Sequence, residues 1–515
     1  MSVHGRITPP GGHGEVLCDP PYATWADIVE ANRRASAGWP EPLRICRDAA
    51  RRELLALARQ WTAALGVDAD RGTDDRPIVM TGHQPELYHP GVWVKVFLLD
   101  RLARETGAIG VDLVVDTDRA GETGARLPLL GPPVAMERVV LTPGTEGAFA
   151  QAAVPDQDER TRFRERGAAV LSDLPAPALG HHFAAFCDAL DDAATRTEDL
   201  GQFMTAARRS YEGPAKSGYL EAPVSQIASL RSYLEWAASL LADAARFREV
   251  MNEALRSYRA RTGTRSGAQP FPDLDAQGAL VEAPFWLLRE GRRERVWVRS
   301  DGALHAGEAL EPVAPDVSPD TLQRLASAGA TLAPKAITLT FFARLFLSDF
   351  FIHGTGGGRY DRVTDAVITA YYGIEPPRFA VASMTLLLPL GAHVATADEV
   401  AVLQQALHRL EHNPDSSLDE LEFDDENEQV RARALADRKG ELVEAIKRPD
   451  ADKKALGAEI REVNAALVAM LEPVVLETRE RLERAVAAQR AADVLTDRTY
   501  PYCLWDPLEV ADKVR

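Results

Sequence analysis

The stretch that decides the fold is residues 78–122, IVMTGHQPELYHPGVWVKVFLLDRLARETGAIGVDLVVDTDRAGE. It opens with a short apolar run, Ile78–Met80, and continues into a polar loop that ends near Pro90. Apolar residues then recur at helical spacing over 91–104, and a second apolar run, Val111–Val115, follows. Strand, helix and strand in this order predict a βαβ unit whose two strands lie parallel in one sheet.

Polar side chains follow both predicted strands. His83 and Gln84 come after the first strand, Asp116 and Asp118 come after the second, and Glu122 lies close behind. Ligands of open parallel sheets bind beyond the carboxyl ends of the strands, so we predict a site here. His83 and Gln84 would face a polar or anionic ligand at a helix N-terminus, and the acidic groups could bind hydroxyls, an ammonium group or a metal, or serve as a base. The alternative is that all these side chains cap turns.

A second candidate element is the glycine-rich run GTGGGRYD at 354–361. Its glycines would let backbone N–H groups approach an anion, and Arg359 would add positive charge. The run matches neither the Walker pattern nor a strand-linked GxGxxG, so nucleotide binding does not follow from it. A tight crossover between two packed helices is the competing interpretation. The predicted anion-binding residues are Gly356, Gly357, Gly358 and Arg359.

Composition limits the class of protein. A chain of 515 residues exceeds one compact core, so two or three domains are expected. The net charge of -18 disfavours a nucleic-acid or anionic-membrane binder. Four scattered cysteines without a CxxC pair indicate neither a zinc site nor a disulfide framework, and no metal site is predicted. The N-terminus lacks the apolar core of a secretory signal, and charged or polar residues interrupt both long apolar stretches. We therefore expect a cytoplasmic protein that acts on small molecules, without membrane or nucleic-acid partners.

Along the chain, we predict an α/β domain over 1–395 that contains a helical insertion at about 155–262. A buried helix is expected over Ile337–His353 and an interior strand over Phe379–Pro389. The remaining residues, 396–515, are expected to form a helical hairpin and a C-terminal tail.

The hairpin is predicted from two helical segments, Gln429–Lys447 and Ala451–Arg490, which join at Arg448-Pro449-Asp450. In the second segment apolar residues alternate spacings of three and four, as in an a/d seam. Pro473 predicts a bend or a change of register. Either the hairpin fills this seam within one chain, or the seam forms a coiled coil between two copies. The seam residues are Ile460, Val463, Leu467, Met470 and Val474.

These motifs resemble the cysteine-adding enzymes of bacillithiol biosynthesis. TGHQPELYHPGVWVK at 81–95 looks like that family's TG[HQ]Q loop and the lysine-bearing helix after it. VDLVVDTDRAGE at 111–122 stands in the place of its acidic strand end, and GTGGGRYD resembles its later glycine-rich element. The helical hairpin matches the family's coiled-coil domain in position.

The resemblance implies a Rossmann-like core related to nucleotidyltransferase-type ligases, together with a helical insertion and a coiled coil used for dimerisation. It also implies that cysteine is added to the amine of a glucosamine–malate conjugate, with ATP as the driving cofactor. The residues that would carry over are Thr81, Gly82, His83, Gln84, Asp116, Asp118 and Gly356–Gly358.

The chain departs from the family at two places. Asp116-Thr117-Asp118-Arg119 replaces the usual His-Asp pair, and the strand expected near 380–388 has no arginine beside Ser383. A divergent enzyme that acts on another amine fits these departures as well as a cysteine ligase does. The second hypothesis is a non-catalytic assembly protein that keeps a degenerate enzyme scaffold and associates through its coiled coil.

Overall fold

The computed structural model describes residues 7–68, 72–130, 134–215, 217–264, 271–390, 397–420, 423 and 425–515. The chain forms two compact units. The larger consists of Met1–Leu127, Glu137–Leu387 and Arg498–Arg515, and the smaller consists of Pro128–Met136 and Leu388–Asp497.

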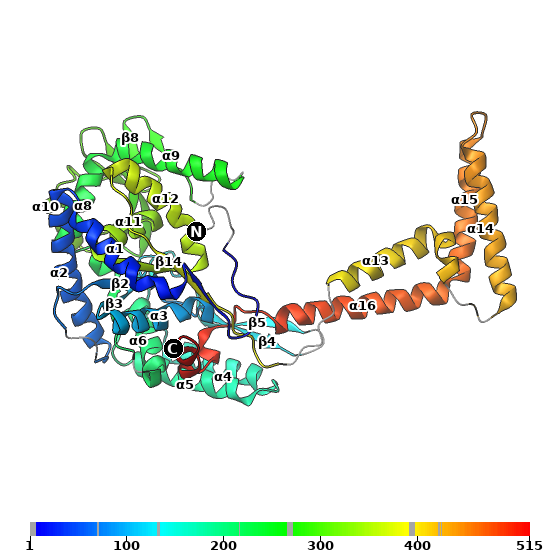
Figure 1. The fold of residues 1–515 in the computed structure, drawn as a ribbon, viewed down its shortest axis with the longest axis horizontal. Helices are drawn as coiled ribbons and strands as arrows, with labels where there is room; N and C mark the ends of the chain where they lie inside the picture. The colour runs from blue at the N-terminus through cyan, green and yellow to red at the C-terminus, as the bar shows by residue number, and fades with distance from the viewer. Residues whose placement is uncertain are drawn as a thin grey trace. The chain divides into compact units, whose positions relative to one another are not determined.

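A six-stranded sheet with the order β1-β14-β13-β2-β3-β6 organises the larger unit (Figure 1). Its strands are β1 Val16–Asp19, β2 Ile78–His83, β3 Ile109–Val114, β6 Leu220–Pro223, β13 Phe350–His353 and β14 Ala380–Met384. The strands from β14 to β6 are parallel, whereas β1 pairs antiparallel with β14. In chain order, β3 and β6 follow β2 on one side of it, and β13 then pairs with β2 on its other side. The direction of growth therefore reverses between β2 and β13.

The predicted βαβ unit is confirmed. Helix α3 (Pro90–Thr106) connects β2 to β3 and packs against both strands. The His89 side chain caps this helix by accepting a hydrogen bond from the Gly91 N–H at 3.0 Å. Gly107 ends it with φ 67°, a left-handed conformation that glycine adopts without a Cβ clash.

Helices surround this sheet and connect its distant strands. Helix α2 packs against β6, and α12 packs against β13 and β14. The α-helices of the unit besides α3 are α1 Trp25–Ala37, α2 Glu41–Ala64, α4 Gln157–Ser172, α5 Pro177–Ala193, α6 Leu200–Glu212, α7 Val224–Ile227, α8 Arg231–Ala242, α9 Ala244–Thr262, α10 Pro319–Ser327, α11 Ala336–Phe342, α12 Thr355–Tyr372 and α17 Pro507–Lys513.

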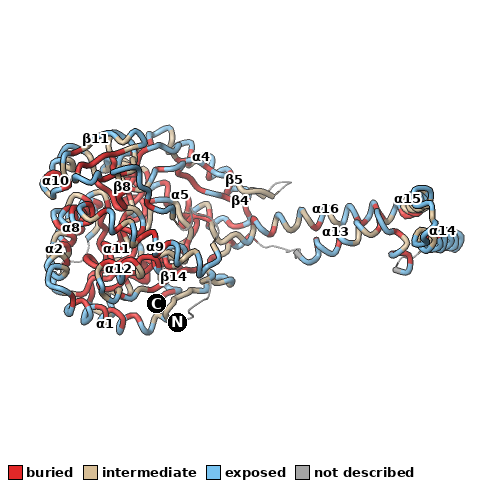
Figure 2. The backbone as a smooth tube through the Cα atoms, turned by 90° about the horizontal axis from the view of Figure 1, so that it is seen from above, coloured by how far each residue is buried: buried red, intermediate tan, exposed pale blue. Residues whose placement is uncertain are grey.

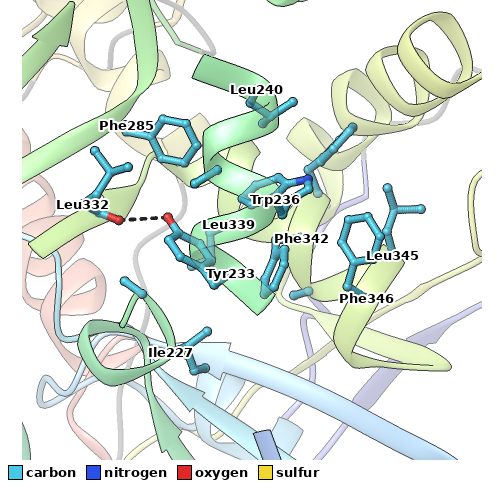
Figure 3. Packing of buried hydrophobic residues seen from close by; sticks show 14 of the residues in the cluster. Ile227, Tyr233, Trp236, Leu240, Phe285, Leu332, Leu339, Phe342, Leu345 and Phe346 are labelled. Atoms are coloured by element: carbon cyan, nitrogen blue, oxygen red, sulfur yellow. Dashed lines mark hydrogen bonds between the residues drawn. The ribbon is translucent and has the colours of Figure 1, made fainter. Parts of the chain in front are cut away.

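A second, antiparallel sheet has the order β11-β10-β9-β8-β12, with β7 paired to β8. Its strands are β7 Ala276–Gln277, β8 Leu280–Arg289, β9 Arg292–Arg299, β10 Leu304–Ala306, β11 Glu311–Ala314 and β12 Thr331–Pro334. Strands β4 (Thr123–Leu129) and β5 (Ala135–Thr142) pair separately. Tyr233 and Trp236 of α8 join this sheet to α11 by packing against Phe285 and Phe342, and the Tyr233 hydroxyl donates to the Leu332 carbonyl at 2.9 Å (Figure 3).

Three predictions for this unit are wrong. The expected helix over Ile337–His353 stops early: α11 passes into a π-helical turn, Ala343–Leu347, and the chain then forms strand β13. The region 155–262 is not a purely helical insertion, because β6 lies within it and joins the main sheet. The glycine run is not a crossover between two packed helices, because it follows strand β13 and Thr355 to Gly358 form the first turn of α12. The predicted strand over Phe379–Pro389 is present as β14.

The smaller unit is helical, and exposed or partly exposed residues prevail along its helices (Figure 2). Its helices are α13 Ala397–His412, α14 Glu426–Ile446, α15 Lys453–Met470 and α16 Glu472–Leu495, with a 3-10 segment Pro414–Glu420. The predicted turn at 448–450 separates α14 from α15. The predicted break also occurs, because Pro473 lies in the first turn of α16, where proline is tolerated.

The apolar seam contacts other helices of the same unit. Leu467 is fully buried and clusters with Leu410 of α13 and Ala432 of α14. Val463, Met470 and Val474 pack against this cluster and are partly buried. Part of the acidic run Asp415–Glu428 lies outside the described residues.

The C-terminal tail differs from its predicted place in the helical region, because Arg498–Arg515 belongs to the larger unit. The backbone N–H of Tyr502 donates to the Tyr88 carbonyl at 2.8 Å, and the Tyr211 hydroxyl donates to the Trp505 carbonyl at 2.6 Å. Both tail aromatics are buried, which explains why the tail leaves the exposed helices. Within the described parts of the chain, every helix is too short or too polar to cross a bilayer.

Candidate functional site

The carboxyl ends of the parallel strands bring several predicted residues to one edge of the sheet. β2 ends at His83 and the neighbouring β13 ends at His353. On the other side of β2, His83 is in register with Val114 at the end of β3. The reversal between β2 and β13 lies at this edge, and doubly wound sheets bind ligands beside such a reversal.

His83 is partly buried and forms an edge contact with the Tyr88 ring, with centroids 5.0 Å apart. Its Nδ1 lies 3.1 Å from the Gln84 carbonyl. Burial, reinforced by the positive charge of Lys95, lowers the pKa of His83 to about 3. The ring is therefore neutral near pH 7 and suits the role of a hydrogen-bonding group, whereas a pKa this low makes it a weak base.

Thr81 and Gly82 position the end of β2. The Thr81 hydroxyl is buried and donates to the Ile352 carbonyl at 2.8 Å, which joins β2 to β13. A Cβ at Gly82 would lie 2.9 Å from Leu113 Cβ, so glycine permits the close approach of β3. The Gly82 carbonyl accepts a hydrogen bond from Lys95 Nζ at 2.8 Å, and burial lowers the pKa of Lys95 to about 8.

Gln84 and Asp118 meet, as the sequence predicted for this edge. Gln84 Nε2 donates to Asp118 Oδ2 at 2.6 Å. Arg293, from strand β9 of the second sheet, pairs with the other oxygen of Asp118 at 2.9 Å. Arg293 also stacks over Trp286, 4.4 Å from the ring centroid. The sequence carried no signal for Arg293, because the packing of the two sheets determines its position.

Asp116 points elsewhere. It is buried and accepts hydrogen bonds from the Ser225 backbone N–H at 2.9 Å and from the Ser225 hydroxyl, at the start of α7. Burial raises the pKa of Asp116 to about 7, and nearby Asp199 adds to the shift. Glu122 is exposed and pairs with Arg138, so it takes no part in this cluster.

The first turn of α12 retains the capacity for anion binding that the glycine run suggested. Gly354 is its N-cap without a side-chain capping bond, and the first intrahelical bond runs from the Gly358 N–H to the Gly354 carbonyl at 3.0 Å. The backbone N–H groups of residues 355–357 precede that bond, at the positive end of the helix dipole. Gly356 and Gly357 are exposed, whereas Gly358 packs so closely on Val381 that a Cβ would overlap it. The predicted charge of Arg359 is directed instead at the Ile7 carbonyl, 3.2 Å away.

The C-terminal tail brings an arginine, Arg498, to Ser383. Arg498 Nη2 donates to the Ser383 hydroxyl at 2.9 Å, and its Nε donates to the Thr385 hydroxyl at 2.9 Å. Both acceptors lie at the carboxyl end of β14, on the predicted edge. Because 115 residues separate Arg498 from Ser383, no local motif could have revealed this contact.

A buried ion network lies next to β3 and β6. Arg208 of α6 pairs with Glu221 at 2.7 Å, with Glu212 at 3.1 Å and with Asp112 at 3.3 Å. All four side chains are almost completely inaccessible to solvent. Charges buried this deeply need such partners, so we interpret the network as a structural support beneath the edge.

A cavity of about 590 Å³ lies at the opposite, amino edge of the sheet. It is lined by the C-terminal end of α2 and by the segment that leads into β6, including Arg209, Ser217 and Gly218. None of the predicted site residues is among those that line it.

Among the described residues, no three His, Cys, Asp or Glu side chains gather in a group that could hold a metal ion. No protein-family model matches the chain, and no curated protein matches it either. The resemblance to the cysteine-adding enzymes therefore depends on the motifs quoted from the sequence.

Proposed function

We propose that this chain is an enzyme of ligase type whose substrates meet over the carboxyl edge of the parallel sheet. The observation that carries the proposal is the reversal between β2 and β13, which places His83 and the start of α12 at neighbouring strand ends. Numbered in chain order, the five parallel strands have the order 5-4-1-2-3, which is the Rossmann order seen from the other side. This order supports a Rossmann-like core.

The reaction comes from the resemblance: an amino acid such as cysteine is joined to the amine of a sugar conjugate. The neutral His83 imidazole would hydrogen-bond to the attacking amine and orient it, because a pKa of about 3 makes the ring too weak a base to take up the amine's proton at neutral pH. Gln84 and Asp118, which already bond to each other, would orient the acceptor. Asp116 accepts hydrogen bonds from Ser225 and would support this edge of the sheet without touching the reacting atoms.

The use of ATP is also inferred from the resemblance, and the first turn of α12 could bind its phosphates. The N–H groups of residues 355–357 precede the first bond of α12, and no side chains at Gly356 and Gly357 obstruct them. These residues would hold a phosphate group, and ATP would supply the free energy for forming the new bond.

The test is to incubate the purified full chain with ATP, cysteine and glucosaminyl-malate and to analyse the mixture by mass spectrometry. We expect a condensed product and nucleotide turnover. His83→Ala should abolish both while leaving the melting temperature nearly unchanged. If folded protein yields neither product nor nucleotide turnover, the proposed reaction is wrong. If His83→Ala mainly lowers stability, His83 has a structural role.

The alternative function is a non-catalytic assembly protein. One observation favours it: Gln84, Asp116 and Asp118 are already bonded within the chain, as in a site that has lost its substrate. Association through a coiled coil of the helical unit belongs to both hypotheses, and exposed Val430 and Leu476 support it. Sedimentation of the full chain tests association, and a stable dimer without turnover would favour the alternative.

A further inference from the structure

The C-terminal tail, Arg498–Arg515, contacts the loop that leads from His83, at the end of β2, into α3. The backbone N–H of Tyr502 donates to the Tyr88 carbonyl in that loop at 2.8 Å. Tyr502 is 1% exposed, so the side chains around it fix its position. Neither the sequence motifs nor the proposed reaction assigns the tail a role, although it contacts a loop of the candidate site.

Three rings in series connect the tail to His83. The Tyr502 and Tyr88 ring centroids are 5.2 Å apart, and the Tyr88 ring meets the His83 ring nearly edge-on at 5.0 Å. On its other side, Tyr502 packs against Trp93 of α3 at 5.2 Å and against Phe186 of α5 at 5.5 Å. Both of these rings are buried, and a close-packed core leaves them little freedom to move. Tyr502 therefore has a fixed position from which it limits the movement of Tyr88, and through it that of His83.

Arg498 holds the beginning of the tail beside the start of α3. Its Nη2 donates to the Ser383 hydroxyl at 2.9 Å and to the Met384 carbonyl at 2.6 Å, and its Nε donates to the Thr385 hydroxyl at 2.9 Å. Three acceptors at one strand end fix the plane of the guanidinium. A Cβ built on Gly91, in the first turn of α3, would lie 2.4 Å from Nη2 and 2.7 Å from the Ser383 Oγ. The tail thus contacts the loop near His83 at Tyr88 and again where the loop enters the helix.

The orientation of the His83 ring determines which nitrogen can accept a hydrogen bond. Nδ1 lies 3.1 Å from the Gln84 carbonyl, which can only accept. A neutral ring in this place carries its proton on Nδ1, and Nε2 is the acceptor. Because the lone pair of Nε2 lies in the plane of the ring, a rotated ring would no longer direct it at the same point.

We propose that Tyr502 is a positioning residue for His83 and that Arg498 fixes the tail beside α3. Tyr502 acts through Tyr88 and does not touch the substrates. It holds the imidazole in the one orientation in which Nε2 accepts a hydrogen bond from the attacking amine. A group that is held in its working geometry before the reaction raises the rate. This inference rests on the proposed function, because it names the residue that orients His83 in that reaction.

The orientation of His83 can be measured without any ligase reaction. In the full chain with isotopically labelled histidine, the NMR signals of the His83 ring are identified by their loss in His83→Gln. The edge contact with Tyr88 should displace these signals from the positions of an unstructured histidine. Tyr502→Met keeps a large apolar side chain but removes the ring, so the His83 signals should move toward the unstructured positions. Tyr502→Phe keeps the ring and should leave the signals in place.

Trp505→Met is the matched control, because it removes another buried aromatic ring of the same tail. Trp505 is 4% exposed, and its ring lies 6.2 Å from that of His13. The substitution should lower the melting temperature about as much as Tyr502→Met does, yet leave the His83 signals unchanged. A general loosening of the tail would instead displace the signals in both variants.

Arg498→Lys keeps the test decisive if Tyr502→Met does not fold. The position is partly exposed, so the fold should persist. A lysine keeps the charge but lacks the planar fork that joins Ser383 to Thr385. The His83 signals should therefore move in the same direction as in Tyr502→Met, by a smaller amount.

The ligase assay then tests the role in the reaction. Tyr502→Met should lower kcat about tenfold or more and leave the KM for ATP nearly unchanged, whereas Tyr502→Phe should retain the activity. The proposal is overturned if the His83 signals of Tyr502→Met and Arg498→Lys coincide with those of the unaltered chain, or if Trp505→Met displaces them equally. Displaced signals with an unchanged kcat would overturn it as well. Displaced signals in a chain that forms no product even when unaltered would refute the proposed reaction and leave the placement of His83 by Tyr502 standing.

Discussion

Replacement of Arg208 by methionine tests whether the buried network supports the edge of the sheet. The substitution nearly preserves volume but removes the guanidinium that pairs with Glu221, Glu212 and Asp112. Arg208 is 5% exposed and Glu221 is fully buried, so water cannot replace the lost partner.

Removal of one member of a buried ion pair costs about 3–5 kcal/mol when the remaining charge stays buried without an adequate partner. Arg209, which lies 3.6 Å from Glu221 and 3.7 Å from Glu212, would replace Arg208 only in part. We expect a loss of that size in the free energy of unfolding, measured by urea denaturation with tryptophan fluorescence. Arg231→Met is the matched control. Arg231 pairs with Glu235 and Asp320 at the surface, with 47% of its side chain exposed, and such pairs contribute about 0–1 kcal/mol.

The loss should also depend on pH. Burial raises the pKa of Glu221 from 4.5 to about 8 even with Arg208 beside it. An acid that binds its proton more tightly in the folded state stabilises the fold at low pH, and this contribution is lost as pH rises from about 4.5 to about 8. Without Arg208 the ionised Glu221 carboxylate is less stable in the folded chain. The loss in the free energy of unfolding caused by Arg208→Met should therefore be larger at pH 8 than at pH 5.

Two results would refute this reasoning. One is a loss no larger than that of Arg231→Met, and the other is an equal deficit at both pH values. The double variant Arg208→Met with Glu221→Gln provides a further check, because neutralising the stranded carboxylate should recover part of the stability. If the double variant is less stable than Arg208→Met, the stranded charge is not the cause.

Three other predictions concern single positions. Leu467→Ala should lower the free energy of unfolding of the helical unit by about 2–5 kcal/mol, measured by urea denaturation with circular dichroism. Val430→Ala, at a 67% exposed position, should change this free energy by less than about 0.5 kcal/mol. Equal effects of the two substitutions would show that Leu467 is not a core residue. Thr81→Val should lose about 1–3 kcal/mol, because the Ile352 carbonyl loses the buried hydrogen bond from the Thr81 hydroxyl, and a stability equal to that of the unaltered chain would contradict this. The ring signals of His83, assigned by their loss in His83→Gln, should not titrate in NMR spectra between pH 8 and 5, since its pKa is about 3; a midpoint near 6.5 would show that the ring is solvated.

The sequence predicted the fold where hydrophobic periodicity was unambiguous. β2 and β3 are short apolar runs on either side of the helical spacing of α3, and the residues that cap α3, His89 and Gly107, agree with this assignment. β13 was mistaken for the end of a helix because the apolar residues around it are buried on all sides, so neither period of two nor period of 3.6 stands out. β6 escaped notice because it has only four residues between helical segments.

The site could be predicted only in part for a related reason. His83, Gln84 and Asp118 were found because they follow strands whose parallel pairing the sequence indicates. Their partner Arg293, and Arg498 beside Ser383, reach the same edge through contacts between distant segments. No local pattern determines such contacts.

The central claim is that ligands bind at the carboxyl edge of the sheet, and hydrogen–deuterium exchange measured with and without ATP and cysteine tests it most directly. We predict slower exchange for amides in 83–92 and 355–358. The amides around the cavity at the amino edge, in 63–68 and 210–218, should be unchanged. Slower exchange confined to the residues that line that cavity would contradict the account and move the functional site to the opposite edge of the sheet.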